Sequence, residues 1–156
     1  MMTTDKLPHP SGRIPSVLCV DDETQVLRAL ERTLDREPYQ VLRACRGTEA
    51  LDLLERFPIQ VIIADQRMPG MSGSDLLEEV RRRWPLVGRI LLTGYPGPDV
   101  MTRGLEVETE FLLVKPWNEN DLRRIIRCLI VDPRRPGASD SGVIDEGWCD
   151  LGGEGG

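Results

Sequence analysis

The stretch of sequence that decides the fold is Val61-Ile62-Ile63-Ala64-Asp65-Gln66-Arg67-Met68-Pro69-Gly70-Met71-Ser72-Gly73. Its first four residues are β-branched or small and apolar, which is typical of a strand buried on both faces of a parallel sheet. The run stops at the carboxylate of Asp65, and the Pro and Gly residues that follow predict a turn before the next helix. Ligands bind at the carboxyl ends of strands in open α/β sheets, so Asp65 is predicted to lie at a functional edge. The competing interpretation is that Asp65 only ends a strand or caps a turn. The two interpretations are distinguished by whether other strands also end in polar residues that would lie at the same edge.

Four more apolar strands alternate with amphipathic helices along the chain. We expect strands at 16–20, 39–44, 59–64, 89–92 and 111–114, and helices at 24–36, from 47 to just before 58, from 72 or 74 to 84, and at 119–131, with a brief or irregular helix in 96–104. Apolar residues recur at helical spacing on the four longer helices. Their predicted inner faces are Val26, Leu27, Leu30, Leu34; Ala50, Leu51, Leu54, Phe57; Leu76, Leu77, Val80, Trp84; and Leu122, Ile125, Ile126, Leu129, Ile130. This order predicts an α/β fold with a doubly wound, five-stranded parallel sheet.

The length and composition favour one globular domain with tails. The chain has 156 residues, of which 40% are hydrophobic and 29% charged. Residues 1–13 are expected to form a flexible leader without a signal peptide, and residues 14–131 the folded domain. Residues 132–156 are a breaker-rich linker and an acidic, Gly-rich tail that we expect to be disordered, the alternative being that Val143, Ile144 and Trp148 dock on the domain or on a partner.

Charge and cysteine usage exclude several function classes. The net charge of −6 argues against nucleic-acid binding, and no apolar run is long enough to span a membrane. The four cysteines show no CxxC spacing, which favours a reduced, cytosolic protein without structural zinc. The only histidine, His9, lies in the polar leader, which argues against histidine metal sites and histidine-based nucleophilic catalysis.

Polar residues with complementary chemistry follow the other apolar strands. Asp21-Asp22 follows the first strand, Thr93 ends the fourth, and Lys115-Pro116 follows the fifth. A parallel sheet would bring all of them to the edge that carries Asp65. Clustered carboxylates repel one another, and Mg²⁺, which prefers oxygen ligands, would relieve that repulsion. The lysine and the hydroxyl could then bind a phosphoryl group on a carboxylate nucleophile.

Over residues 14–131, the sequence resembles the receiver domain of two-component response regulators. The motifs that carry the resemblance are Asp65-Gln66-Arg67-Met68-Pro69-Gly70-Met71, Leu91-Leu92-Thr93-Gly94-Tyr95 and Lys115-Pro116-Trp117, and they look most like receivers of HD-GYP or NtrC-type regulators. The resemblance implies a flavodoxin-like, CheY-like (βα)5 sandwich. It also implies a phosphoacceptor in the cytoplasm that takes part in its own phosphorylation and dephosphorylation but is not otherwise an enzyme.

The resemblance implies a role for each residue at the sheet edge. Asp65 would be phosphorylated by a sensor histidine kinase or a phosphotransfer protein. Asp21 and Asp22 would be the acid pair that holds Mg²⁺, with Asp22 and Asp65 as direct ligands and the backbone carbonyl of Arg67 as another. Tyr95 and Arg67 would restrict the access of water to the phosphoryl group.

The remaining residues would bind the phosphoryl group and pass on the signal. Thr93 would donate a hydrogen bond to it, and Lys115 would form an ion pair with it and precede a cis peptide bond to Pro116. The change would reach the face formed by the fourth helix, fifth strand and fifth helix. That face would contact a downstream protein that the sequence does not identify, or a second copy of the chain in a homodimer.

One departure from the family pattern leaves alternatives open. The family usually has Phe or Tyr three residues before the lysine, but here that position is Leu112, and Phe111 could replace it only if the strand is shifted or bulged. A receiver-like interaction module that works without phosphate is therefore an alternative. A haloacid-dehalogenase-type phosphatase is a weaker one, because Gln66-Arg67 after Asp65 does not match the DxD motif of that class.

Overall fold

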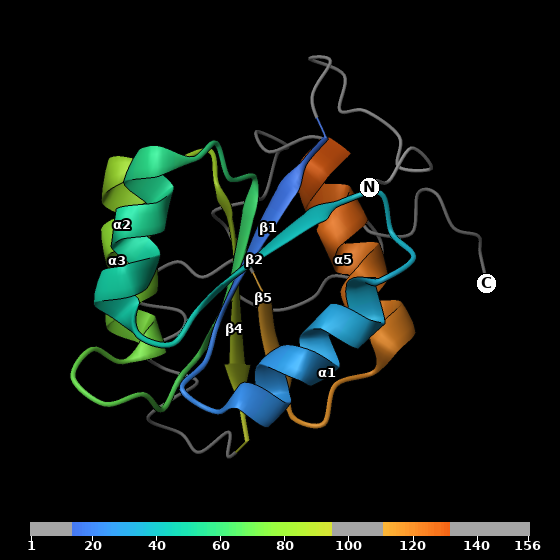
Figure 1. Ribbon diagram of the computed structural model, residues 1–156, viewed down its shortest axis with the longest axis horizontal. Helices are drawn as coiled ribbons and strands as arrows, with labels where there is room; N and C mark the ends of the chain where they lie inside the picture. The colour runs from blue at the N-terminus through green and yellow to red at the C-terminus, as the bar shows by residue number, and fades with distance from the viewer. Residues whose placement is uncertain (1–13, 95–110, 132–156) are drawn as a thin grey trace.

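The computed structural model describes residues 14–94 and 111–131, and their helices and strands follow the predicted order (Figure 1). The elements are β1 (Ser16–Val20), α1 (Thr24–Leu34), β2 (Gln40–Ala44), α2 (Gly47–Arg56), β3 (Val61–Asp65), α3 (Gly73–Arg83), β4 (Gly88–Thr93), β5 (Phe111–Val114) and α5 (Glu119–Val131). The five strands of the described residues form one parallel sheet in the order β2-β1-β3-β4-β5. This confirms the predicted doubly wound α/β fold. The leader, the brief helix expected in 96–104, and the linker and tail lie outside the described residues.

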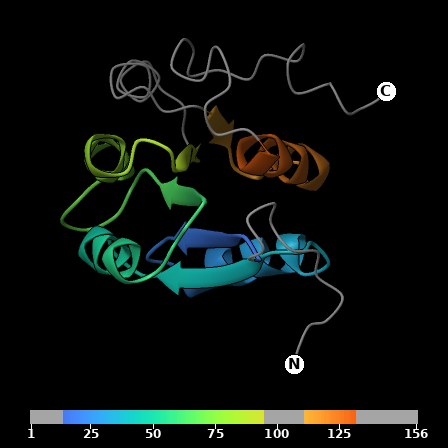
Figure 2. The ribbon, with the colours of Figure 1, turned by 90° about the horizontal axis from the view of Figure 1, so that it is seen from above.

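Helices cover both faces of the sheet, which is why most strand positions are apolar. Helices α1 and α5 lie on one face, and α2 and α3 on the other (Figures 1 and 2). Successive side chains of a strand point to opposite faces, so β1 contributes Val17 and Cys19 to the core under α1 and α5, and Leu18 and Val20 to the core under α2 and α3. The predicted inner face of α5 is buried throughout.

Two aromatic residues that we expected on inner helix faces lie just beyond the helices instead. Phe57 adopts an extended conformation after α2 and is 44% exposed, since the following Pro58 disfavours a helical conformation at this position. Trp84 follows α3 and is half-buried against the core, with the guanidinium of Arg83 4.4 Å from the centre of its ring. Helix α1 ends at Leu34, two residues earlier than predicted, and the bounds of β2, β3 and β4 differ from prediction by one or two residues.

Polar contacts tie the start of α5 to the end of α1. The indole N–H of Trp117 donates to Oγ1 of Thr33 at 3.2 Å, and the hydroxyl of Thr33 donates to Oε2 of Glu119 at 3.3 Å. Nη1 of Arg123 donates to the carbonyl oxygen of Thr33 at 2.8 Å. Because Trp117 lies two residues after Lys115, these bonds fix the connection that follows β5.

Candidate functional site

The strand register brings the predicted site residues to one edge of the sheet. Val20 pairs with Ala64, so Asp21 follows β1 beside Asp65 at the end of β3. Thr93 ends β4 and pairs with Val114 of β5, so Lys115 follows next to it, and its N–H donates to the carbonyl oxygen of Thr93 at 2.8 Å. Four strands therefore supply the side chains that sequence analysis grouped together.

Three carboxylates meet at this edge. One carboxylate oxygen from each of Asp21, Asp22 and Asp65 lies within 4.8 Å of the others. Asp21 and Asp65 are buried, whereas Asp22 is exposed. An all-oxygen donor set with one side open to solvent fits a hard cation such as Mg²⁺, which takes one or two carboxylates and retains water ligands.

Lys115 balances the two buried carboxylates. Its Nζ lies 2.6 Å from Oδ1 of Asp65 and 3.2 Å from Oδ2 of Asp21. Burial raises the pKa of Asp21 and the carboxylate of Asp65 adds to this rise, while the N–H of Glu23 and the ammonium group of Lys115 oppose it. Burial lowers the pKa of Lys115, but its hydrogen bonds and its attraction to the two carboxylates outweigh burial and leave the pKa raised. Lys115 therefore stays charged at neutral pH.

Main-chain N–H groups orient both buried carboxylates. The N–H of Glu23 donates to Oδ1 of Asp21 at 2.8 Å, and the N–H of Arg67 donates to Oδ2 of Asp65 at 3.1 Å. Each is a bond from the residue two positions later, as in an Asx turn. Oδ1 of Asp65 thus faces Lys115 while Oδ2 faces the β3–α3 loop.

A hollow of about 380 Å³ opens over these groups. Its lining residues are Asp22, Glu23, Asp65, Arg67, Thr93, Gly94 and Lys115. Thr93 is buried at the end of β4. Among residues 14–94 and 111–131, a Cβ added at Gly94 would meet no atom within 4 Å. Tyr95, the other residue expected to limit water access, lies outside the described residues.

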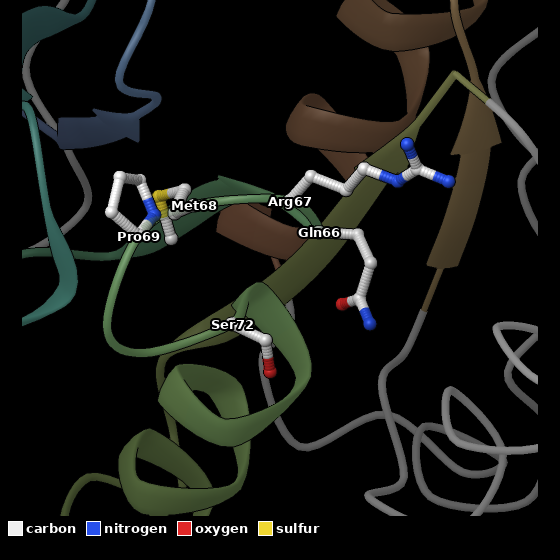
Figure 3. Close-up of a pocket in the computed structure, with 5 residues that line it drawn as sticks. All are labelled: Gln66, Arg67, Met68, Pro69 and Ser72. Carbon is white, nitrogen blue, oxygen red and sulfur yellow. The ribbon is translucent and has the colours of Figure 1, made fainter.

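The β3–α3 loop borders a second hollow of about 530 Å³, lined by Gln66, Arg67, Met68, Pro69 and Ser72. Figure 3 shows that the side chains of Gln66 and Arg67 leave the loop in different directions. Sequence analysis assigned no role to Gln66, yet its side-chain oxygen accepts two hydrogen bonds from Ser74. No periodic pattern in the sequence marks this contact, because it joins a loop residue to a residue in the first turn of α3, eight positions later.

The register of β5 settles the position of the family's missing aromatic residue. Phe111 to Val114 pair in unbroken register with Ile90 to Thr93 of β4. Phe111 is fully buried in the core under α1 and α5, while Leu112 packs against the core on the other face. The strand is neither shifted nor bulged, so Phe111 does not stand in for an aromatic residue at position 112. The Lys115–Pro116 peptide bond is cis, as the resemblance implied.

Comparisons with known proteins agree with this geometry. Residues 17–127 match the family described as the response regulator receiver domain. The hydrogenase transcriptional regulatory protein HoxA of Cupriavidus necator is 42% identical over 118 residues, which are 75% of this chain and 24% of that protein. The crystal structure of the signal receiver domain of an HD domain-containing protein from Pseudomonas fluorescens Pf-5 superposes with a TM-score of 0.74 at 31% identity, covering 78% of this chain and 90% of that one. The chemotaxis protein CheY4 of Vibrio cholerae gives a TM-score of 0.69 at 30% identity over 74% of this chain and 98% of that one.

The chain spans about a quarter of the length of the hydrogenase regulators that it matches. Among the helices in residues 14–94 and 111–131, none is both long enough and apolar enough to cross a membrane.

Proposed function

We propose that this chain, which belongs to the family of response regulator receiver domains, accepts a phosphoryl group on Asp65 in a phosphorelay. The observation that carries the proposal is the placement of Asp65. Asp65 is the last residue of the central strand β3, its carboxylate lies 2.6 Å from Nζ of Lys115, and the carboxylates of Asp21 and Asp22 lie beside it at an open hollow. Receiver domains work with histidine kinases and are in general signalling modules rather than enzymes.

The residues at the edge have complementary tasks in the transfer. A carboxylate oxygen of Asp65 attacks the phosphorus atom of a phosphohistidine on the kinase or phosphotransfer protein, and the bond from phosphorus to the histidine nitrogen breaks. Lys115 pairs with the phosphoryl oxygens and Thr93 donates a hydrogen bond to them. Mg²⁺, bound by Asp21, Asp22, Asp65 and the Arg67 carbonyl, would neutralise charge on the phosphoryl oxygens.

Phosphorylation would change the charge of the edge and bias two conformations of the domain. The group adds about −1.5 to −2 charges beside Thr93 and Lys115. A downstream protein would then recognise one conformation, provided that the two differ by only a few kcal/mol. We place this signalling in the cytoplasm, because Cys19 and Cys45 form no disulfide bond within the part of the chain that the structure describes.

Position 112 supports a second candidate function. Leu112 has no aromatic ring to move with Thr93, and the regular register of β5 keeps Phe111 on the opposite face. A receiver-like module that binds its partner without phosphate would need no such movement. Phosphorylation in solution distinguishes the two candidates.

The test is the intact mass of the protein after incubation with acetyl phosphate, with and without Mg²⁺. We expect one added phosphoryl group that requires Mg²⁺ and is lost in Asp65→Asn. Asp52→Asn, the same change at an exposed carboxylate on α2, is the matched control and should be labelled like the wild type. If the wild type gains no phosphoryl group while a known receiver is labelled in parallel, the phosphate-independent module is favoured instead.

A further inference from the structure

Gln66 binds the start of α3 through both its main chain and its side chain. Its carbonyl oxygen accepts from the N–H of Gly73 at 3.0 Å, and its Oε1 accepts from N and Oγ of Ser74 at 2.9 and 2.7 Å. Its own N–H donates to the carbonyl oxygen of Leu92 at 2.8 Å, one residue beyond the last β3–β4 pair, Asp65 with Leu92. Gln66 is therefore bonded to the sheet on one side and to the helix on the other.

These bonds satisfy donors that a helix start leaves without intrahelical partners. In α3, the N–H groups of Gly73 and Ser74 bond to Gln66, and the N–H of Asp75 donates to Oγ of Ser72 at 3.1 Å. Ser74 is fully buried, so removing the Gln66 oxygen would leave a buried N–H and a buried hydroxyl without that partner. The side chain at position 66 thus clamps α3 to the end of β3.

The loop closed by this clamp contains the main chain that faces the acidic site. Arg67 follows Gln66 directly, and its N–H donates to Oδ2 of Asp65 at 3.1 Å. Its carbonyl is the main-chain ligand assigned to Mg²⁺ in the proposed function. Because Gln66 is held on both sides, the direction in which the chain enters Arg67 is fixed as well.

We infer that Gln66 is a positioning residue: with Ser74 it holds the Arg67 main chain where that main chain can orient Asp65 and bind Mg²⁺. The inference rests on the proposed function, because it concerns the same site. Groups that orient metal ligands in this indirect way typically change metal affinity by 10- to 100-fold when they are removed.

The experiment measures the dissociation constant for Mg²⁺ by following backbone amide NMR shifts during a titration. Gln66→Met keeps the length of the side chain but removes the acceptor, and should raise the dissociation constant about tenfold, or about 1.4 kcal/mol. Ser74→Ala removes one of the two side-chain bonds and should raise it by about threefold. Gln66→Glu keeps an acceptor oxygen and should bind Mg²⁺ at least as tightly as the wild type. The matched control is Gln40→Met, at an exposed position of β2.

Equal dissociation constants for Gln66→Met and Gln40→Met would overturn the inference. If Gln66→Met fails to fold, Ser74→Ala decides, and affinity equal to that of the wild type overturns the inference. A role in stability alone would lower the free energy of unfolding without Mg²⁺ and leave the dissociation constant unchanged, which also overturns it. If the wild type binds no Mg²⁺, the proposed metal site and this inference are refuted together. If the wild type binds Mg²⁺ and Gln66→Met binds it with the same dissociation constant, only the positioning role of Gln66 is refuted.

Discussion

Replacing Gly73 by Ala should destabilise the domain, because α3 begins in van der Waals contact with the end of β3. An added Cβ would lie 2.4 Å from the carbonyl oxygen of Asp65 and 2.8 Å from Cδ1 of Leu91. Real Cβ atoms essentially never come within 3.0 Å of a non-bonded atom outside their own and neighbouring residues, so the gap to Asp65 must widen from 2.4 to at least 3.0 Å. Leu91 can change rotamer, but the Asp65 carbonyl belongs to a strand paired on both sides, so the helix has to move.

The expected magnitude combines three effects. Overpacking of this kind costs about 1–3 kcal/mol. Moving the helix also weakens the 3.0 Å bond from the N–H of Gly73 to the carbonyl of Gln66, which is worth about 0.5–1.5 kcal/mol. The higher helix propensity of Ala offsets about 1 kcal/mol. We therefore expect the free energy of unfolding to fall by about 0.5–3.5 kcal/mol.

Urea unfolding followed by circular dichroism measures this change. The matched control is Gly94→Ala, where an added Cβ meets no described atom within 4 Å, and the expected change is within about 0.5 kcal/mol. Gly70→Ala should cost about 1 kcal/mol without any clash, because Gly70 has a φ of +83°. A Gly73→Ala protein as stable as Gly94→Ala would refute the reasoning from close contact.

Two further predictions concern the core and the connection after β5. Burial raises the pKa of the Cys19 thiol from 9.0 to about 12, so the folded state retains a proton that the unfolded chain releases. The stability from this group is complete below pH 9 and is lost by about 1.4 kcal/mol per pH unit above it. Cys19→Ala should flatten the fall in unfolding free energy from pH 9 to 10.5, and an unchanged slope would contradict this. Thr33→Val removes the acceptor of the Trp117 indole N–H, so it should lower the unfolding free energy by about 1–2 kcal/mol and shift the indole N–H resonance. Thr33→Ser keeps the hydroxyl and should leave that resonance in place. Equal spectra for the two variants would contradict the contact.

Most of the fold and the grouping of the site could be predicted because both depend on regular patterns. Runs such as residues 61–64 identify strands, and a polar residue at the end of each parallel strand must lie at a common edge. Asp21, Asp65, Thr93 and Lys115 come together for that reason. Their roles toward Mg²⁺ and phosphate remain proposals.

What could not be predicted depends on single contacts or on the ends of helices. Phe57 fits the helical spacing of α2 but is exposed, because the adjacent proline ends the helix before it. Glu37 accepts two bonds from Arg127 at 3.2 and 3.1 Å across 90 positions of sequence, and Gln66 bonds to Ser74 across eight. Such pairings follow from tertiary packing and leave no periodic trace in the sequence.

The place of β5 in the sheet has a consequence for how the site opens. Lys115 follows a strand of four residues at the outer end of the sheet order, whereas Asp65 ends a strand that is paired on both sides. Local openings of a protein start where few contacts must break, and the cost of such an opening lies well below that of global unfolding. The acids therefore follow strands that are paired on both sides, whereas their counter-charge follows a strand at the end of the sheet order. Fraying at this margin would release the lysine and leave two buried carboxylates facing each other, so hydrogen exchange of the β5 amides would report the charge balance of the site.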